Sequence, residues 1–450
     1  MKLIIVGVGN VGETLVKNLE EEGHDVTVVD SDIEVVNEKV NKFDVQGFVG
    51  GCLQRDVLID AGVETADFFI ACTSHDEVNI LSCVLAKKLG AKFTVARVRQ
   101  PEYFLEMESL RENLGLDLAF NPEKRAAFDI FEVLKFPSAK SVELFADGRA
   151  NMIQCEIKKG NPIIGKSLME IGKEYGHVLF ATIERNGTSV IPRGDFIVEE
   201  NDDIHIIGSE TELVKFCKKT NIFKRPAKSV FIIGGSNIAY YLAKELIASG
   251  VSVKILEKNK QRANELATSL PKATVLVGDG TDQTALDEEG VDKCDACVAL
   301  MDIDEQNVMV SLYLKQKGDY KVITKIDRNS MLDMINKLGL ESVVSPRISI
   351  ANHIVRFVRS NGRALASGGV KMLYKINQNT EALEFVIDES FAKIGVELKT
   401  LGIKRDVLVA GIVRGEEFIL PTGNAVLEKN DKIIIVTTSK KIKEISEILS

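Results

Sequence analysis

Residues 2–32 read KLIIVGVGNVGETLVKNLEEEGHDVTVVDSD, and this stretch decides the fold. Lys2–Val6 is a short β-branched apolar run, which is typical of a strand buried on both faces. After the glycines an apolar residue recurs at every fourth position, which indicates one face of a helix. A second apolar run, DVTVVD at 25–30, completes a strand–helix–strand unit with parallel strands and a right-handed crossover.

The same alternation of strands and helices continues to residue 97, which predicts a doubly wound parallel sheet. The sequence predicts strands at 46–49, 67–72 and 92–97, and helices at 33–42, 53–61, 76–89, 101–113 and 122–135. The helix at 101–113 carries an apolar stripe formed by Tyr103, Phe104, Met107 and Leu110. That stripe either covers its own sheet or docks on another module, and the sequence leaves both alternatives open.

A smaller domain follows, at about 142–222. Apolar strands flank Asn186-Gly187, a strong signal for a two-residue hairpin turn. Short helices are expected near 167–175 and 210–219. The smaller domain is therefore expected to be α+β.

The whole module occurs twice in the chain. VGVGNVGE at 6–13 is matched 227 positions later by IGGSNIAY at 233–240. ADFFIACTSHDEVN at 66–79 resembles CDACVALMDIDEQN at 294–307, and the hairpin segment from 190 resembles that from 419. The sequence thus predicts two Rossmann-like α/β domains, each followed by a small α+β domain.

Looser composition marks the expected boundaries at 135–141, 223–229 and 359–369. The predicted domains are the Rossmann-like units at 1–138 and 228–358 and the α+β units at 139–224 and 366–450.

Composition limits the class of protein. The 450-residue chain is 45% hydrophobic and 27% charged, as soluble globular proteins are, and it contains no apolar run near the ~20 residues that span a bilayer. A net charge of −9 argues against nucleic acid as a main partner. The seven cysteines form no disulfide framework, and the Cys294/Cys297 pair is expected to lie at a buried strand rather than to bind zinc. We therefore expect a cytosolic protein.

The first glycine loop predicts a nucleotide site. Gly7 permits a tight turn, Gly9 lets the backbone approach a pyrophosphate, and Gly12 lets helix and strand pack closely. The helix that follows presents unpaired N–H groups and a partial positive charge to phosphates. Asp30, at the end of the second strand, is placed to accept hydrogen bonds from ribose hydroxyls. Because a carboxylate repels a 2′-phosphate, this cleft favours NAD or an adenine nucleotide over NADP.

Polar residues at the ends of two further strands extend this site. Thr73, Ser74 and His75 follow the fourth strand, where their side chains contact a ribose or phosphate, cap the next helix, or do both. Arg97 ends the fifth strand and suits either a phosphate oxygen or a structural ion pair.

The second glycine loop has lost part of this pattern. It keeps Gly234 and Asn237, and Glu257 stands where Asp30 does, but Ser236 and Ala239 replace Gly9 and Gly12. We therefore expect weaker binding there, or a different ligand.

No catalytic group is shared by the two copies. A dehydrogenase needs a substrate domain and a proton donor beside the nicotinamide, and His75 is replaced by Ile303 in the repeat. The pattern favours a sensor over an enzyme. A soluble NAD-dependent oxidoreductase and a nucleotide-binding scaffold remain the alternatives.

The segment at 2–32, GDG at 278–280 and the hairpin segments IPRGD and LPTGN resemble the TrkA family of Trk potassium-uptake proteins over the whole chain. Members of that family carry tandem RCK (KTN) modules, each a Rossmann-like domain plus a C-terminal α+β domain. The resemblance implies a non-catalytic regulatory subunit of potassium transport that binds NAD(H) and/or ATP/ADP.

The resemblance also implies a ring of RCK units, as a homotetramer, on the cytoplasmic face of the plasma membrane beneath a TrkH/TrkG-type transporter. Carried over by position, it implies that the first nucleotide site consists of Gly7, Val8, Gly9, Asn10, Val11, Gly12, Asp30, Thr73, Ser74 and Arg97. For the second site it implies Gly234, Gly235, Ser236, Asn237, Ile238, Glu257 and Lys325.

Overall fold

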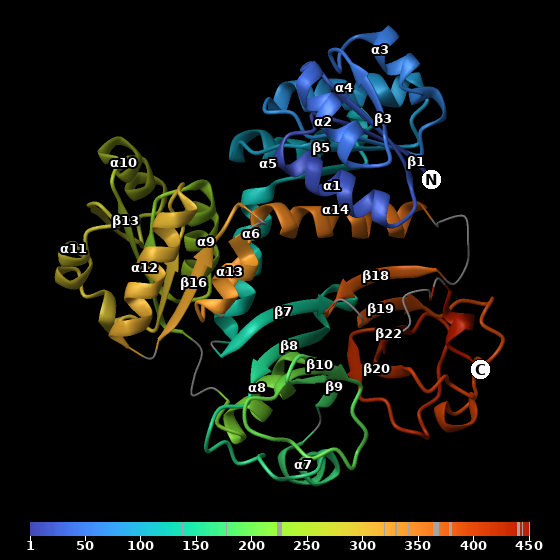
Figure 1. Ribbon diagram of the computed structural model, residues 1–450, viewed down its shortest axis with the longest axis vertical. Helices are drawn as coiled ribbons and strands as arrows, with labels where there is room; N and C mark the ends of the chain where they lie inside the picture. The colour runs from blue at the N-terminus through green and yellow to red at the C-terminus, as the bar shows by residue number, and fades with distance from the viewer. Residues whose placement is uncertain are drawn as a thin grey trace.

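The chain forms two parallel and two antiparallel sheets in the computed structural model (Figure 1). The structure describes residues 1–136, 138–176, 178–222, 227–318, 320–328, 331–340, 342–362, 369–377, 380–438, 442 and 444–449. The boundary segments expected at 135–141, 223–229 and 359–369 therefore lie partly outside the described residues.

The first parallel sheet has the strand order β3-β2-β1-β4-β5-β6. Its strands are β1 (Lys2–Val6), β2 (Asp25–Asp30), β3 (Gln46–Val49), β4 (Phe68–Ala71), β5 (Phe93–Arg97) and β6 (Leu118–Phe120). Its helices are α1 (Asn10–Glu21), α2 (Ile33–Lys42), α3 (Arg55–Asp60), α4 (Asp76–Leu89) and α5 (Pro101–Leu114). The doubly wound sheet is confirmed, and only the three-residue strand β6 is too short to be seen in the sequence pattern.

The second parallel sheet repeats this order as β14-β13-β12-β15-β16-β17. Its strands are β12 (Ser229–Ile233), β13 (Ser252–Glu257), β14 (Thr274–Val277), β15 (Ala296–Ala299), β16 (Lys321–Lys325) and β17 (Val343–Val344). Its helices are α9 (Asn237–Ala248), α10 (Lys260–Ser269), α11 (Gln283–Glu288), α12 (Asp304–Lys317) and α13 (Leu332–Lys337). The identical order confirms the duplication, and Cys297 lies buried in β15 as expected.

The two antiparallel sheets also share one topology. The first consists of β7 (Ala139–Phe145), β8 (Ala150–Glu156), β9 (Leu179–Arg185), β10 (Thr188–Val190) and β11 (Asp203–Gly208), with α7 (Leu168–Tyr175) and α8 (Glu210–Lys219). The second consists of β18 (Val370–Lys375), β19 (Glu381–Val386), β20 (Val407–Arg414), β21 (Glu417–Ile419) and β22 (Lys432–Thr437). The hairpin at Asn186-Gly187 is confirmed, with both residues at positive φ.

These small sheets bury one apolar cluster between them, which includes Met152 and Ile207 from the first and Ile434 and Val436 from the second. In Figure 1 they lie side by side, below the first parallel sheet and to the lower right of the second. Among the described residues, no helix combines the length and apolar content needed to cross a bilayer.

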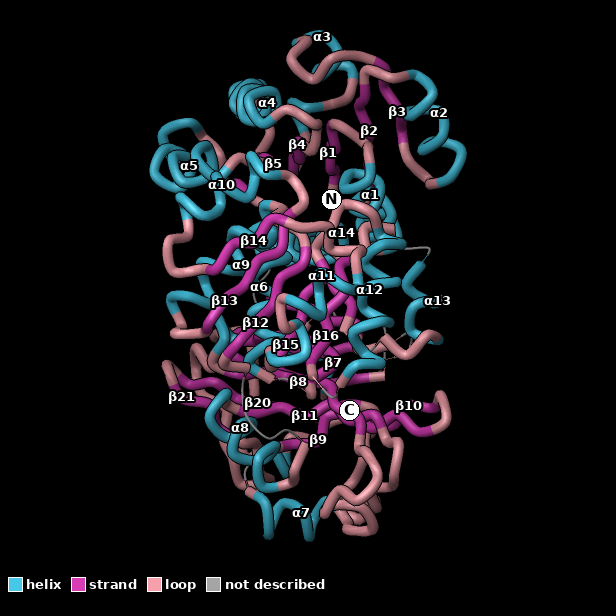
Figure 2. Tube along the Cα trace, turned by 90° about the vertical axis from the view of Figure 1, so that its left-hand side faces the viewer, coloured by secondary structure: helices cyan, strands magenta, loops and turns pink. Residues whose placement is uncertain are grey.

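The two repeats exchange a helix. Helix α6 (Pro122–Lys135) leaves the first sheet and packs on the second, where Ile130 joins the same cluster as Val230 and Leu242. Helix α14 (Pro346–Gly362) does the reverse, and its Ile350 and Ile354 pack with residues of β1 and α1. Fully burying one Ile side chain contributes about 1.5–3 kcal/mol, so the two exchanged helices hold the repeats together by apolar packing. Figure 2 shows α6, α9 and α14 gathered in the middle of the molecule.

The apolar stripe of α5 covers its own sheet. Phe104 and Met107 are buried in the cluster that contains Ile4 and Phe69. Tyr103 and Leu110, on the same helix, stay exposed. Of the two alternatives that the sequence left open, packing on the parent sheet is the one observed within the chain, and α6 makes the contact with the other repeat.

Candidate functional site

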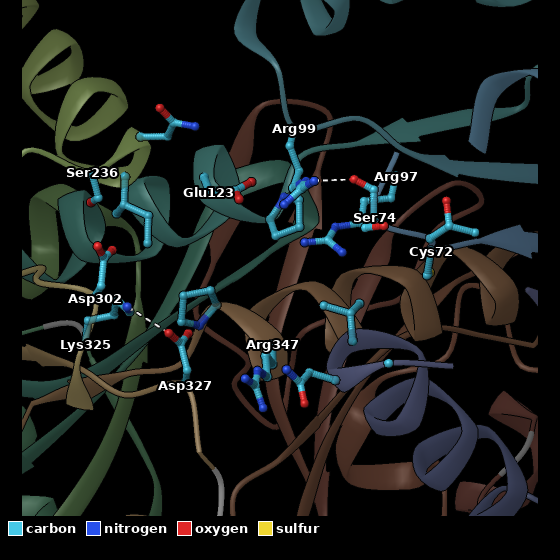
Figure 3. Close-up of a pocket in the computed structure, with 18 of the residues that line it drawn as sticks. Cys72, Ser74, Arg97, Arg99, Glu123, Ser236, Asp302, Lys325, Asp327 and Arg347 are labelled. Carbon is cyan, nitrogen blue, oxygen red and sulfur yellow. Dashed lines mark hydrogen bonds and ion pairs between the residues drawn. The ribbon is translucent and has the colours of Figure 1, made fainter. Parts of the chain in front are cut away.

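Both glycine loops open into one cavity of about 1410 Å³ between the carboxyl ends of the two parallel sheets. Figure 3 shows residues from both repeats around it, with Arg97, Arg99 and Glu123 facing Lys325, Asp327 and Arg347. Of the residues expected at the two sites, those that line the cavity are Gly7, Gly9, Asn10, Val11, Asp30, Thr73, Ser74, Arg97, Gly234, Gly235, Ser236, Asn237, Ile238, Glu257 and Lys325. Val8 and Gly12 do not line it.

The first loop needs each of its glycines for a different reason. Gly7 has φ +79°, and a Cβ there would lie 2.6 Å from the backbone nitrogen of Thr73. A Cβ on Gly12 would lie 2.4 Å from the Gly7 carbonyl oxygen, so Gly12 serves close packing of helix and strand. Nothing lies within 4 Å of a Cβ built on Gly9, which caps α1 without a side-chain hydrogen bond. The N-terminus of α1 therefore stays open to an anion in the cavity.

Asp30 braces the first loop. Its Oδ2 accepts a hydrogen bond from the Val8 amide at 3.0 Å, and its Oδ1 accepts one from the Asp32 amide at 3.1 Å. A carboxylate offers about four acceptor positions, so room remains for ribose hydroxyls. Val8 thus contributes its N–H to the site while its side chain is buried in the core.

A buried asparagine, which the sequence analysis missed, organises the ends of β4 and β5. Asn79 accepts from the Thr73 amide at 2.8 Å and from the Thr73 hydroxyl at 2.7 Å. Its side-chain amide donates to the carbonyl oxygens of Thr73 and Arg97 at 3.1 and 3.0 Å. Asn307 makes the matching contacts with Met301 and Lys325 in the second repeat. The signal was visible, because both aligned segments end in asparagine.

The hydroxyls beside Asn79 do not cap α4. His75 is the N-cap residue of α4 and makes no side-chain capping hydrogen bond. The Ser74 hydroxyl lies 2.9 Å from His75 Nδ1, and both residues line the cavity. The capping alternative is therefore not what the structure shows.

Arg97 faces the cavity without an ion pair. No acidic group lies within 4.0 Å of it among the residues that the structure describes, and its buried Nε has no hydrogen-bond partner. Burial lowers the pKa of the guanidinium, and the nearby Glu123 carboxyl opposes that shift. The structural ion pair offered by the sequence is absent from the described part of the chain, which leaves this cation accessible to an anion in the cavity.

Two further charged residues at this place were missed from the sequence. Arg99 donates from Nη2 to the Ser74 carbonyl, and its backbone amide donates to Asp76 Oδ2 at 2.8 Å. Glu123, in the first turn of α6, lines the cavity, and burial raises the pKa of its carboxyl. Neither residue belongs to a recognisable sequence motif, because both reach the cavity only through the tertiary fold.

The second loop keeps the turn but is capped by its own side chain. Gly234 has φ +99°, and a Cβ there would lie 2.8 Å from the Met301 amide nitrogen. The Ser236 hydroxyl accepts a hydrogen bond from the Ala239 amide at 3.4 Å, so one N–H of α9 already has a partner. Glu257 reaches the Gly235 amide at 2.6 Å, as Asp30 reaches that of Val8.

Lys325 differs from Arg97, its counterpart in the first repeat. Its ammonium lies 2.7 Å from Asp327 Oδ2 and donates to the Met301 carbonyl at 3.2 Å. Its side chain is 8% exposed. In the second cleft, the cation at the end of the fifth strand, Lys325, is therefore paired with an acid. Arg97, at the same place in the first cleft, has no such partner among the described residues.

Comparisons with known proteins agree with this architecture. The TrkA-N domain model matches residues 3–122 and 230–346, and the TrkA-C domain model matches 152–221 and 382–450. A Trk system potassium uptake protein TrkA homolog of Archaeoglobus fulgidus is 32% identical over 450 residues, covering 100% of both chains. Trk system potassium uptake protein TrkA of Vibrio alginolyticus is 31% identical, covering 98% of this chain and 96% of its own.

Among solved structures, the GsuK channel bound to NAD superposes with a TM-score of 0.63, at 17% identity, over 98% of this chain and 77% of its own. This likeness concerns the fold. The paired domains and the full-length relatives show that the chain belongs to the TrkA family.

Proposed function

We propose that this protein is a nucleotide-binding regulatory subunit of a membrane potassium transporter. NAD(H), ATP or ADP occupies the first cleft, with its phosphates at the N-terminus of α1 and its ribose at Asp30. Thr73, Ser74 and Arg97 complete this cleft, and Gly234 to Ile238, Glu257 and Lys325 form the second. Support comes from the open loop, the unpaired Arg97 and the family's full-length members named for potassium uptake.

One observation carries the regulatory part of the proposal: the exchanged helices begin in the cavity wall. Pro122 and Glu123 of α6, and Pro346 and Arg347 of α14, all line the cavity. Asn121, which caps α6, donates to the Arg99 carbonyl at 2.8 Å and to the Tyr241 hydroxyl at 3.3 Å. A ligand in the cavity therefore contacts elements that belong to both repeats, and it favours the relative orientation in which those contacts are best.

The free energy needed to shift the conformation is larger than one phosphate contact contributes, which favours several sites acting together. Moving a two-state equilibrium from 1:99 to 99:1 takes ~5.5 kcal/mol of differential binding. One extra phosphate charge at a helix terminus contributes about 0.3–1 kcal/mol. A homotetrameric ring of these chains on the cytoplasmic face of a TrkH/TrkG-type transporter multiplies this contribution, and additional charged contacts, such as that of a phosphate with Arg97, make up the remainder.

The test is potassium flux in vesicles that contain a TrkH/TrkG-type transporter, with this chain added from the cytoplasmic side. We expect flux to depend on the chain and to differ between saturating ATP and ADP. Equal flux with both nucleotides, or no association with the transporter, contradicts the proposal. Substrate-dependent absorbance change at 340 nm with NAD and metabolite pools would instead support an oxidoreductase.

A further inference from the structure

The two clefts differ most in the residues that follow the acid at the end of the second strand. In the first repeat Asp30 is followed by Ser31 and Asp32, and Val35 packs against the core. At the matching positions the second repeat has Lys258, Asn259 and Arg262. Lys258 and Arg262 both line the cavity.

Arg262 lies across the second glycine loop. Its Nε donates to the Gly235 carbonyl at 2.8 Å, and its Nη2 donates to Asn237 Oδ1 at 3.0 Å. Its Nη1 lies 3.2 Å from Glu265. A guanidinium has five N–H donors, so two remain for a ligand.

Glu257, at the end of β13, accepts hydrogen bonds from two backbone amides, as Asp30 does in the first cleft, so the two clefts differ in the cations Lys258 and Arg262 and not in the acid. Its Oε2 accepts from Gly235 at 2.6 Å, and its Oε1 accepts from Asn259 at 2.6 Å. A Cβ on Gly235 would lie 2.8 Å from Glu257 Oε2, so the longer acid lies back against the loop. Glycine at this position, where the first repeat has Val8, makes room for it.

Lys258 supplies a second cation at the rim. Its ammonium lies 2.6 Å from Asp279 Oδ2, which leaves it two further N–H donors. The side chain is 76% exposed, so it can move to meet a ligand.

The end of this strand is where Rossmann-type sites read the adenosine ribose, with an acid for the free hydroxyls or an arginine for a 2′-phosphate. We propose that the second cleft binds a nucleotide whose adenosine ribose carries a phosphate, of the NADP(H) type, with Arg262 and Lys258 holding that phosphate. This inference rests on the proposed nucleotide-binding role of the second cleft. The first cleft, with Asp30 and Ser31 at the same place, takes the unphosphorylated ribose.

The test is calorimetry on the full-length chain with adenosine 2′,5′-bisphosphate and AMP, and with NADP(H) and NAD(H). Asp30→Ala weakens the first cleft and isolates the second. In that background we expect the 2′-phosphorylated ligands to bind about tenfold more tightly than their counterparts, the value of one charge-assisted contact. Arg262→Val and Lys258→Ser introduce the residues of the first repeat. Each substitution is expected to bring the ratio of the affinities for the ligands with and without the 2′-phosphate towards one.

The ratio of the affinities for the ligands with and without the 2′-phosphate distinguishes a direct contact between Arg262 and that phosphate from a purely structural role of Arg262. If Arg262 only held the glycine loop, Arg262→Val would weaken all four ligands equally and leave the ratio unchanged, which would overturn the inference. Failure of the wild type to bind adenosine 2′,5′-bisphosphate at millimolar concentration would also overturn it. If Arg262→Val does not fold, Lys258→Ser carries the same test.

These outcomes are distinguishable from failure of the proposed function. Binding of NAD(H), ATP or ADP that depends on Asp30, together with no preference for the 2′-phosphate, overturns this inference alone. Absence of any Asp30-dependent binding counts against the proposed function, whatever the second cleft does.

Discussion

The Asp30 carboxylate accepts a hydrogen bond from the Val8 amide at 3.0 Å, which ties the end of β2 to the glycine loop. The second repeat makes the same tie between Glu257 and Gly235, with a longer acid and a smaller loop residue. The tie therefore survives in the copy whose loop has lost two glycines. This conservation of the contact between the two repeats indicates that the acid stabilises the loop conformation in the absence of a bound ribose.

Asp30→Ala is expected to raise the dissociation constant for NAD(H), ATP or ADP at the first cleft by roughly 10–100-fold. A hydrogen bond to a charged group contributes about 1.5–3 kcal/mol, and this change removes both the brace and the ribose contact. Calorimetry measures the change. Asp30→Asn, which keeps one oxygen acceptor, is expected to fall in between, and an unchanged affinity in Asp30→Ala would refute the assignment.

Asn79→Ala and Asn307→Ala form a matched pair. Both side chains are fully buried, and each removal leaves strand-end backbone groups without partners, at a cost of roughly 1–3 kcal/mol for each group. Both variants are expected to unfold at lower temperature in scanning calorimetry. Because Asn79 positions Thr73 and Arg97, only the Asn79 variant should also lose affinity at the first cleft. Equal affinity losses in the two variants would argue against this specific role of Asn79.

Ile354→Ala tests the helix exchange. The side chain is fully buried on α14 yet packs against the first sheet, and such truncations cost about 2–5 kcal/mol. We expect lower stability and weaker nucleotide binding at the first cleft. Ile435→Ala, equally buried in a small sheet, is the control, and it should lower stability without changing that affinity. If both variants bind nucleotide like the wild type, α14 does not support the cleft.

His205 predicts a pH dependence of stability. Burial, assisted by Lys140, lowers the pKa of His205 to about 4, against ~6.5 in the unfolded chain. The unfolded state therefore takes up a proton first as the pH falls, and stability declines by up to about 1.4 kcal/mol per pH unit between ~6.5 and 4. Above pH ~6.5 the residue contributes no pH dependence. Urea unfolding across this range should show a shallower slope in His205→Gln, and a slope identical to that of the wild type would contradict the assignment.

The architecture could be predicted because its signals are local and repeated. The apolar runs, the glycine loop and the hairpin at Asn186-Gly187 each carry a period or turn signature that needs no tertiary information. The duplication repeats the apolar runs and their spacing, although the second glycine loop keeps only part of its pattern. Strand β6 was missed because three residues are too few to establish a period.

The site could be predicted only as far as its residues follow the strand ends. Loop residues and Asp30 are fixed by the strand–helix–strand unit, but Glu123 and Arg347 enter the cavity from helices that are exchanged between repeats. No pattern in the sequence indicates that α6 and α14 are exchanged between the repeats. Arg262 was overlooked for a similar reason, since its contact with the second loop depends on how α10 packs.

The most direct test of the account is the distance between the two parallel sheets as the cavity is filled. Spin labels on Asp60→Cys in α3 and Glu288→Cys in α11 report it by pulsed electron resonance, in a Cys294→Ser background. The other native thiols are buried, and burial raises the pKa of Cys72 to about 12, which keeps its thiol unreactive. We predict different distance distributions with ATP and ADP at concentrations that just saturate the wild type, and a smaller difference at the same concentrations in Asp30→Ala, which binds both nucleotides more weakly. Identical distributions in the wild type with ATP, ADP and no ligand would contradict the account.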